Sequence, residues 1–127
     1  MALGFERTPA AGGPLVRGFS ADGFLVDGQS YQAVLLTPER AAAWDPPAPA
    51  ELGLADLEPV LALEPPPEFL ILGTGPRMAF APRALVKALE ARGIGLEAMD
   101  SRAAARTWGI LRAEERWIAA ALMPLGK

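Results

Sequence analysis

The chain has 127 residues, of which 51% are hydrophobic, and it carries a formal net charge of -3 at pH 7. The length and hydrophobic content indicate one globular domain with a core of its own. The negative charge disfavours general binding to nucleic acid or to an anionic membrane surface. Because the sequence contains no Cys and no His, one chain cannot supply a thiol nucleophile, an imidazole base or a Cys/His zinc site.

Proline, glycine and alanine dominate the first 18 residues, which are predicted to form a loose N-terminal arm. This stretch lacks the charged-then-apolar order of a signal peptide. No apolar run approaches the roughly 18 residues that span a bilayer. We therefore expect a cytoplasmic protein without membrane insertion, with one α/β domain over residues 19–124 and a tail at residues 125–127.

A β-hairpin is predicted at the start of this domain. Its first strand covers residues 24–26, and Asp27-Gly28 is a strong signal for the two-residue turn of a hairpin. The return strand is expected to run without a break from about residue 30 to residue 36. No residue of the hairpin indicates chemistry, so we interpret it as structural.

Residues 38–53 are rich in proline and alanine and are predicted to lack regular structure. Trp44 is the largest apolar side chain in this connector. Either it attaches the connector to the core or it is an exposed anchor for a protein partner, since Trp is enriched at binding hot spots. A short helix is predicted over residues 56–63, with Asp56 as its N-cap.

The second half of the chain alternates strands and helices. The predicted elements are a buried strand at residues 69–72, a helix from Pro82 to Gly93, a strand at residues 95–99, a helix capped by Asp100 or Ser101, and an internal strand at residues 117–122. The helix after Ser101 is expected to bury Ala103 or Ala104, Thr107, Ile110 and Leu111. This order is typical of a parallel strand pair covered by helices.

The glycine-rich turn at residues 73–75 invites comparison with nucleotide-binding loops. A dinucleotide-binding loop requires a third glycine where this chain has Met78, and it leads directly into a helix. Here no helix can begin until about Pro82. The Lys-Ser/Thr pair of a phosphate-binding P-loop is also missing. A nucleotide cofactor is therefore disfavoured.

The loops at the carboxyl ends of parallel strands meet at one edge of a sheet, where ligands bind in folds of this class. We call this edge the loop edge, and its candidate ligand-binding or anion-binding residues are Gly73, Thr74, Gly75, Arg77, Asp100, Ser101 and Arg106. Helix N–H groups and guanidinium groups there favour a small anion. The structural alternative is that Asp100 pairs with Arg77 or Arg106 and joins the two loops.

The runs LILGTGPRMAF, ALEARGIGLEAMDSRAAARTW and RWIAAALMP resemble a family of domains of unknown function. It includes mitochondrial complex I (NADH dehydrogenase) assembly factor 3, an adipogenesis-associated mammalian protein, and stand-alone bacterial and archaeal chains. The resemblance covers nearly the whole sequence. It implies a three-layer α/β fold with a central mixed sheet, a β-hairpin at the N-terminal end and an antiparallel last strand. The family pattern often has Cys at Ala105 and Asn at Gly109. These departures leave this chain without a thiol there, which argues against redox or nucleophilic chemistry as the common function of the family.

These observations predict a non-catalytic binding module that acts like an assembly factor, through protein contacts. We expect no catalytic residue, no metal site, no cofactor and no nucleic-acid partner. Trp44 is the candidate for a partner contact. The alternative function is binding of a small anion or metabolite, or weak enzymatic activity, at the loop edge.

Overall fold

The computed structural model describes residues 13–126, and a mixed sheet of five strands lies at its centre, in the order β6-β5-β9-β7-β8. The strands are β5 (Val34–Leu36), β6 (Ala41–Ala43), β7 (Phe69–Gly73), β8 (Gly95–Met99) and β9 (Ala119–Leu122). The predicted parallel pair is formed by β7 and β8. Strand β9 is antiparallel to β5 but parallel to β7, so the expected antiparallel direction of the last strand holds on one side only.

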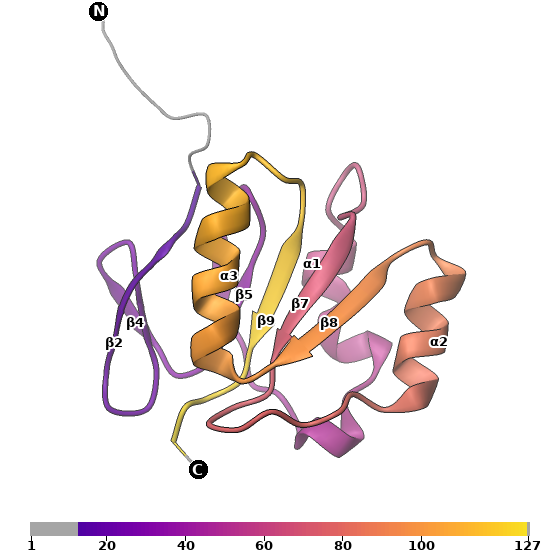
Figure 1. Ribbon diagram of the computed structural model, residues 1–127, viewed down its shortest axis with the longest axis horizontal. Coiled ribbons are helices and arrows are strands. Elements are labelled where there is room, and N and C mark those ends of the chain that lie inside the picture. The colour runs from indigo at the N-terminus through magenta and orange to yellow at the C-terminus, as the bar shows by residue number, and fades with distance from the viewer. Residues whose placement is uncertain (1–12, 127) are drawn as a thin grey trace, which may run out of the picture.

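Strands β2 (Val16–Phe19), β3 (Phe24–Val26) and β4 (Gln29–Tyr31) form a second, antiparallel sheet that lies beside α3 in Figure 1. Asp27 and Gly28 have φ values of 48° and 89°, as the predicted two-residue turn requires. The return strand is not continuous, because residues 32–33 separate β4 from β5 and the two strands belong to different sheets. All three residues of β5 are buried, as expected for an internal strand of a sheet that is covered on both faces.

Helices cover both faces of the five-stranded sheet. Helix α1 (Glu58–Leu61) and helix α2 (Arg83–Ala91) lie on one face, and α3 (Ser101–Ala113) lies on the other together with the small sheet (Figure 1). Leu70 and Leu72 of β7 pack in the core on the α1 and α2 side, whereas Ile71 packs on the α3 side. This alternation produces the three layers that the family resemblance implies.

The proline-rich connector contains regular structure that was not expected. Strand β6 lies inside it, and two 3-10 helices follow, Pro49–Glu51 and Leu54–Leu57. Asp56 is not the N-cap of a helix over residues 56–63. Its carboxylate accepts a hydrogen bond from the backbone N–H of Gly53 at 2.9 Å, one turn before the short helix α1.

The buried face of α3 also differs from the prediction. Trp108 is fully buried, and its indole N–H donates to the carbonyl oxygen of Pro14 at 2.9 Å. Ile110 is instead 62% exposed. Trp108 therefore attaches the N-terminal segment. Ala104 is fully buried and Leu111 packs against the same core cluster, as predicted, so the differences are the burial of Trp108 and the exposure of Ile110.

Parts of the expected arm and tail are packed against the domain. The arm is described only from residue 13, Pro14 is buried, and Val16–Phe19 pairs with β3. Leu125 is also buried, and its N–H donates to the carbonyl oxygen of Asp22 at 3.0 Å. The described residues outside 19–124 are thus not loose, whereas residues 1–12 and 127 lie outside the described residues. Within residues 13–126, no helix has both the length and the apolar character to cross a membrane.

Candidate functional site

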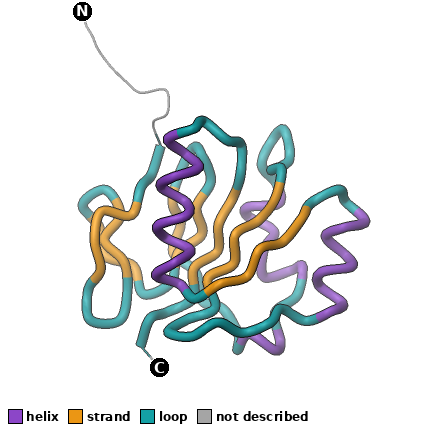
Figure 2. The backbone as a smooth tube through the Cα atoms, in the orientation of Figure 1, coloured by secondary structure: helices purple, strands orange, loops and turns teal. Residues whose placement is uncertain are grey.

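The predicted loop edge forms at the carboxyl ends of β7, β8 and β9. The long loop from β7 to α2 and the start of α3 meet there, at the lower side of the view in Figure 2. Backbone hydrogen bonds connect the segments, because Thr74 N–H donates to the carbonyl oxygen of Met99 and Met123 N–H donates to that of Gly73, both at 2.9 Å. The sequence therefore placed these segments correctly relative to one another.

Ser101 connects the three strand ends. It is fully buried, and its hydroxyl accepts a hydrogen bond from the N–H of Gly75 and donates to the carbonyl oxygen of Met123, each at 2.8 Å. Its own N–H donates to the carbonyl oxygen of Gly75 at 2.8 Å. The polar groups of Ser101 are thus used within the protein.

The glycines of the loop edge allow close packing around this serine. A Cβ atom on Gly73 would lie 2.8 Å from the hydroxyl oxygen of Ser101 and 2.9 Å from its Cα. Gly75 has a φ of +105°, in the left-handed region that favours glycine. Both glycines are therefore explained by backbone geometry alone, without a phosphate group.

Thr74 is also used internally, with 6% of its surface exposed. Its hydroxyl donates to the carbonyl oxygen of Arg77 at 2.7 Å and accepts from the N–H of Ala79 at 3.0 Å. These bonds hold the first residues of the loop in a fixed turn. The inward-facing polar groups of the loop edge are consequently satisfied by the protein itself.

The charged residues of the loop edge lie apart from this network. Arg77 and Arg106 are exposed, and Asp100 acts as the N-cap of α3, as predicted, by accepting from the N–H of Ala103 at 2.9 Å. In the described part of the chain, no ion pair joins Asp100 to either arginine. The structural alternative of an Asp–Arg link is therefore not observed, and anion binding at these residues stays a prediction.

A shallow hollow of about 290 Å³ lies next to Gly75. Its lining comes mainly from the connector and from the chain after β9, and it consists of Pro46, Pro47, Ala48, Pro49, Thr74, Gly75, Pro76, Met123, Pro124 and Gly126. None of Arg77, Asp100 and Arg106 belongs to this lining. The hollow therefore does not bring the charged groups together around a small molecule. Among residues 13–126, no three acidic side chains gather in a way that would hold a metal ion.

Two apolar side chains of the same loop lie at the surface, and the sequence did not predict their exposure. Phe80 is 83% exposed and Met78 is 49% exposed, on either side of Ala79. The segment was predicted as an irregular loop, but loop composition alone does not indicate which side chains face solvent. Large exposed apolar residues that share one short segment are typical of a contact surface.

Trp44 is half-buried and packs against the core cluster on the α1 and α2 side. Its indole N–H donates to the carbonyl oxygen of Asp56 at 3.0 Å, which attaches the connector to the 3-10 helix Leu54–Leu57. This placement fits the structural interpretation of Trp44. A partner contact through its exposed part stays a prediction.

Comparison with known sequences gives relatives along most of the chain. A family model described as protein of unknown function (DUF498/DUF598) matches residues 16–123. The chain is 30% identical over 124 residues to NADH dehydrogenase (ubiquinone) 1 alpha subcomplex assembly factor 3 of Danio rerio, covering 97% of this chain and 71% of that protein. The Xenopus tropicalis protein of the same name is 28% identical over 107 residues, and the match spans 58% of its length. An uncharacterized protein of Rhodobacter capsulatus is 31% identical over 121 residues, covering 94% of this chain and 92% of that protein.

Solved structures show the same fold. A crystal structure of a Bordetella parapertussis protein superposes with a TM-score of 0.81 at 36% identity, covering 91% of this chain and 99% of that chain. A solution structure from Bordetella pertussis, described as a Mth938-like domain, gives a TM-score of 0.78 at 30% identity, covering 100% of this chain and 94% of that chain.

Proposed function

We propose that this chain, which belongs to the DUF498/DUF598 family of proteins of unknown function, is a non-catalytic module that binds another protein, in the manner of an assembly factor. Relatives from Danio rerio and Xenopus tropicalis carry the name of an assembly factor of NADH dehydrogenase. Such a role requires a surface that recognises a protein, and it requires no catalytic group. The internal use of Ser101 and Thr74 agrees with this requirement.

The observation that carries the proposal is the exposure of Phe80, at 83%, beside Met78, at 49%. Arg77 precedes them on the same loop and is also exposed. Aromatic residues, Met and Arg are enriched in protein interfaces. A loop that holds these three residue types in solvent supports a partner contact through residues 77–80.

The turn at the start of this loop supports the same function. The hydroxyl of Thr74 accepts a hydrogen bond from Ala79 N–H at 3.0 Å, in the middle of the exposed segment. A loop ordered before binding loses less conformational entropy when a partner binds. The polar network of the loop edge would thus position the apolar residues, without contacting the partner itself.

The test is affinity purification from the native cells with three forms of the protein: the parent, the double variant Met78→Ser, Phe80→Ser, and the control Ile110→Ser. Ile110 is an exposed apolar residue of α3 outside this loop. We expect at least one protein to bind the parent and the control and to be lost from the double variant. Equal recovery from all three forms would contradict the proposal.

The second candidate function is binding of a small anion at the loop edge. It is favoured by the exposure of Arg77 and Arg106, for which no ion pair is found within residues 13–126. A thermal-shift screen with phosphate, sulfate, carboxylates and nucleotides, run on the parent and on an Arg77→Ala, Arg106→Ala variant, separates the two functions. A ligand at about a hundred times its Kd adds roughly 2.7 kcal/mol of stability. A shift in the parent that the variant loses would support anion binding.

A further inference from the structure

Strand β6 lies at one edge of the five-stranded sheet, and among residues 13–126 no strand pairs with its outer side. Thr37 N–H donates to the carbonyl oxygen of Arg40 at 3.0 Å. In an antiparallel ladder successive residues direct their backbone groups alternately toward and away from the partner strand, so this bond shows which residues of β6 face β5. Ala42 therefore directs its backbone groups toward β5. Ala41 and Ala43 direct their N–H and C=O groups away from the sheet, where a further strand can bond to them.

The side chains of β6 do not protect this edge. Natural proteins usually cover or charge an edge strand, or place a proline or a bulge in it, because unpaired backbone groups recruit other chains. In β6 all three side chains are methyl groups, and the ladder with β5 is regular. The short length of β6 limits the contact to a few backbone hydrogen bonds, so any specificity must come from neighbouring side chains.

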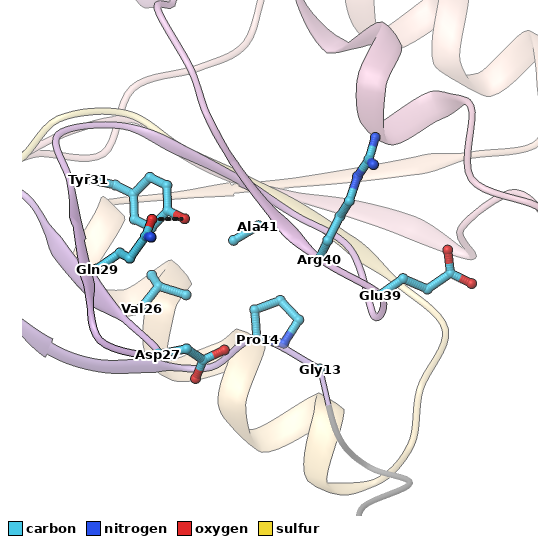
Figure 3. A pocket seen from close by; sticks show the side chains of 9 residues that line it. All are labelled: Gly13, Pro14, Val26, Asp27, Gln29, Tyr31, Glu39, Arg40 and Ala41. Atoms are coloured by element: carbon cyan, nitrogen blue, oxygen red, sulfur yellow. Dashed lines mark hydrogen bonds between the residues drawn. The ribbon is translucent and has the colours of Figure 1, made fainter.

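Two hollows adjoin the start of β6, one from each face of the sheet. The first, of about 400 Å³, is shown in Figure 3, and we call it the Tyr31 hollow. Its lining consists of Gly13, Pro14, Val26, Asp27, Gln29, Tyr31, Glu39, Arg40 and Ala41. The second, the Glu64 hollow, has about 370 Å³, and its lining consists of Thr37, Glu39, Arg40, Pro59, Ala62, Leu63 and Glu64.

The pairing register connects these hollows to the edge. Ala41 lies opposite Leu36, whose side chain packs on the α3 side of the sheet, as does the Tyr31 hollow. The next residues on either side of Ala41 face the α1 side, where the Glu64 hollow lies. An added strand would thus place one side chain beside the Tyr31 hollow and its neighbour beside the Glu64 hollow.

The Tyr31 hollow has the chemistry for a long basic side chain. Arg40 and Glu39 point away from it, whereas Tyr31 and Gln29 line one side (Figure 3). Asp27 supplies a carboxylate that is 46% exposed, and its ion pair with Arg17 is long, at 3.7 Å. Exposed pairs of this kind contribute little, so the carboxylate can accept a second cation. Apolar atoms of the lining would contact the methylene stem of a Lys or Arg.

We infer that the outer edge of β6 binds an extended segment of a partner protein by strand addition. The segment places a Lys or Arg side chain in the Tyr31 hollow and an apolar side chain against the Pro59 and Leu63 side of the Glu64 hollow. This binding mode combines backbone bonds for affinity with hollows for alternate side chains. The surface is separate from the loop at residues 77–80, and its test does not depend on the proposed function.

The test uses a fluorescein-labelled peptide, Val-Lys-Val-Lys-Val-Lys-Val, with the full-length protein. In an antiparallel pairing with β6 its lysine residues should lie opposite Ala41 and Ala43, so the lysine N–H groups form the bonds. We expect the peptide to shift the NMR signals of the Ala41 and Ala43 amides. N-methylation of the three lysine amides should abolish binding, whereas N-methylation of three valine amides should preserve it. Equal binding of both methylated peptides, or unchanged signals from Ala41 and Ala43, would overturn the inference.

Two variants test the same contact from the protein side. Ala43→Pro removes one outward N–H without touching the bonds to β5, and we expect about tenfold weaker peptide binding. Asp27→Asn should weaken binding several-fold, and Asn tolerates the positive φ at this position. Glu51→Gln removes one exposed negative charge elsewhere and serves as the matched control. If Glu51→Gln weakens binding as much as Asp27→Asn, the attraction is general and the inference fails.

Discussion

The loop edge and the outer edge of β6 differ in how their backbone groups are used. At the loop edge, the N–H of Gly75 and the carbonyl oxygen of Met123 both bond to the hydroxyl of Ser101, at 2.8 Å. At β6, the outward groups of Ala41 and Ala43 have no strand partner in the described part of the chain. The polar groups of the loop edge are thus bonded to one another, whereas the outer edge of β6 is not paired with any strand of residues 13–126. Polar residues near strand ends can thus form hydrogen bonds within the fold only, whereas alanines in an edge strand can leave backbone N–H and C=O groups available to a partner.

The largest effect on the loop edge is expected for Ser101→Ala, which removes the hydroxyl that connects the strand ends. The change leaves a buried N–H and a buried C=O without their partner, and each costs about 1–3 kcal/mol. We expect the free energy of unfolding to fall by about 3 kcal/mol in urea titrations. Ser30→Ala, on the exposed face of β4, is the control and should change it by less than about 0.5 kcal/mol. A small loss for Ser101→Ala would mean that water replaces the hydroxyl and that the network is not closed.

Gly73→Ala tests the close approach at the same place. The new methyl group would lie 2.8 Å from the hydroxyl oxygen of Ser101, so the backbone of β7 or α3 must move. Overpacking of this kind costs about 1–3 kcal/mol, and we expect about 2 kcal/mol by thermal or urea unfolding. Gly109→Ala is the control, because its Cβ would meet no atom within 4 Å and alanine favours the helix. Equal stability of the two variants would contradict the tight packing around Ser101.

Proline at two adjacent positions of β6 tests which groups face outward. Ala42→Pro removes an N–H that bonds to β5, and we expect a loss of about 1.5 kcal/mol. Ala43→Pro removes an outward N–H, and we expect a loss below about 0.5 kcal/mol. Urea unfolding of the two variants measures the difference. The reverse order would show that the ladder has the opposite alternation and that Ala42 faces outward.

The smallest effect is expected for the exposed loop residues. Met78→Ser with Phe80→Ser should change the free energy of unfolding by less than about 0.5 kcal/mol, because the substituted side chains are largely in solvent. Circular dichroism during heating measures this. A large loss of stability would show that Phe80 packs within the protein, and the loss of a binding partner from this variant would then have no specific meaning.

Several elements could be predicted because local chemistry decides them. Strand β8 has the predicted bounds of residues 95–99, and Asp100 caps α3, since a short apolar segment between Gly93 and a capping residue leaves few alternatives. Strand β6 was missed because three alanines carry no strand preference and only the pairing with β5 makes them a strand. Trp108 was missed from the buried face of α3 because its indole N–H is bonded to Pro14, a residue 94 positions away.

The position of the candidate site could be predicted from the sequence, but the hydrogen bonds and the exposure of its residues could not. The sequence brought Thr74, Gly75 and Ser101 to one edge, because parallel strands separated by a helix must end together. It could not show that Ser101 bonds to Met123, since that depends on where β9 enters the sheet. The exposure of Phe80 likewise depends on a turn that Thr74 forms with Arg77 and Ala79, which no local propensity describes.

The position of β9 has a consequence for biosynthesis. Strand β9 lies between β5 and β7, yet the ribosome makes it after both of them. Until residues 119–122 leave the exit tunnel, the hairpin β5–β6 and the pair β7–β8 remain two separate pieces with apolar strand edges. Such edges are prone to aggregation during folding. A nascent chain that pauses before residue 119 would therefore keep both edges unpaired, although the finished protein closes the gap with a single four-residue strand.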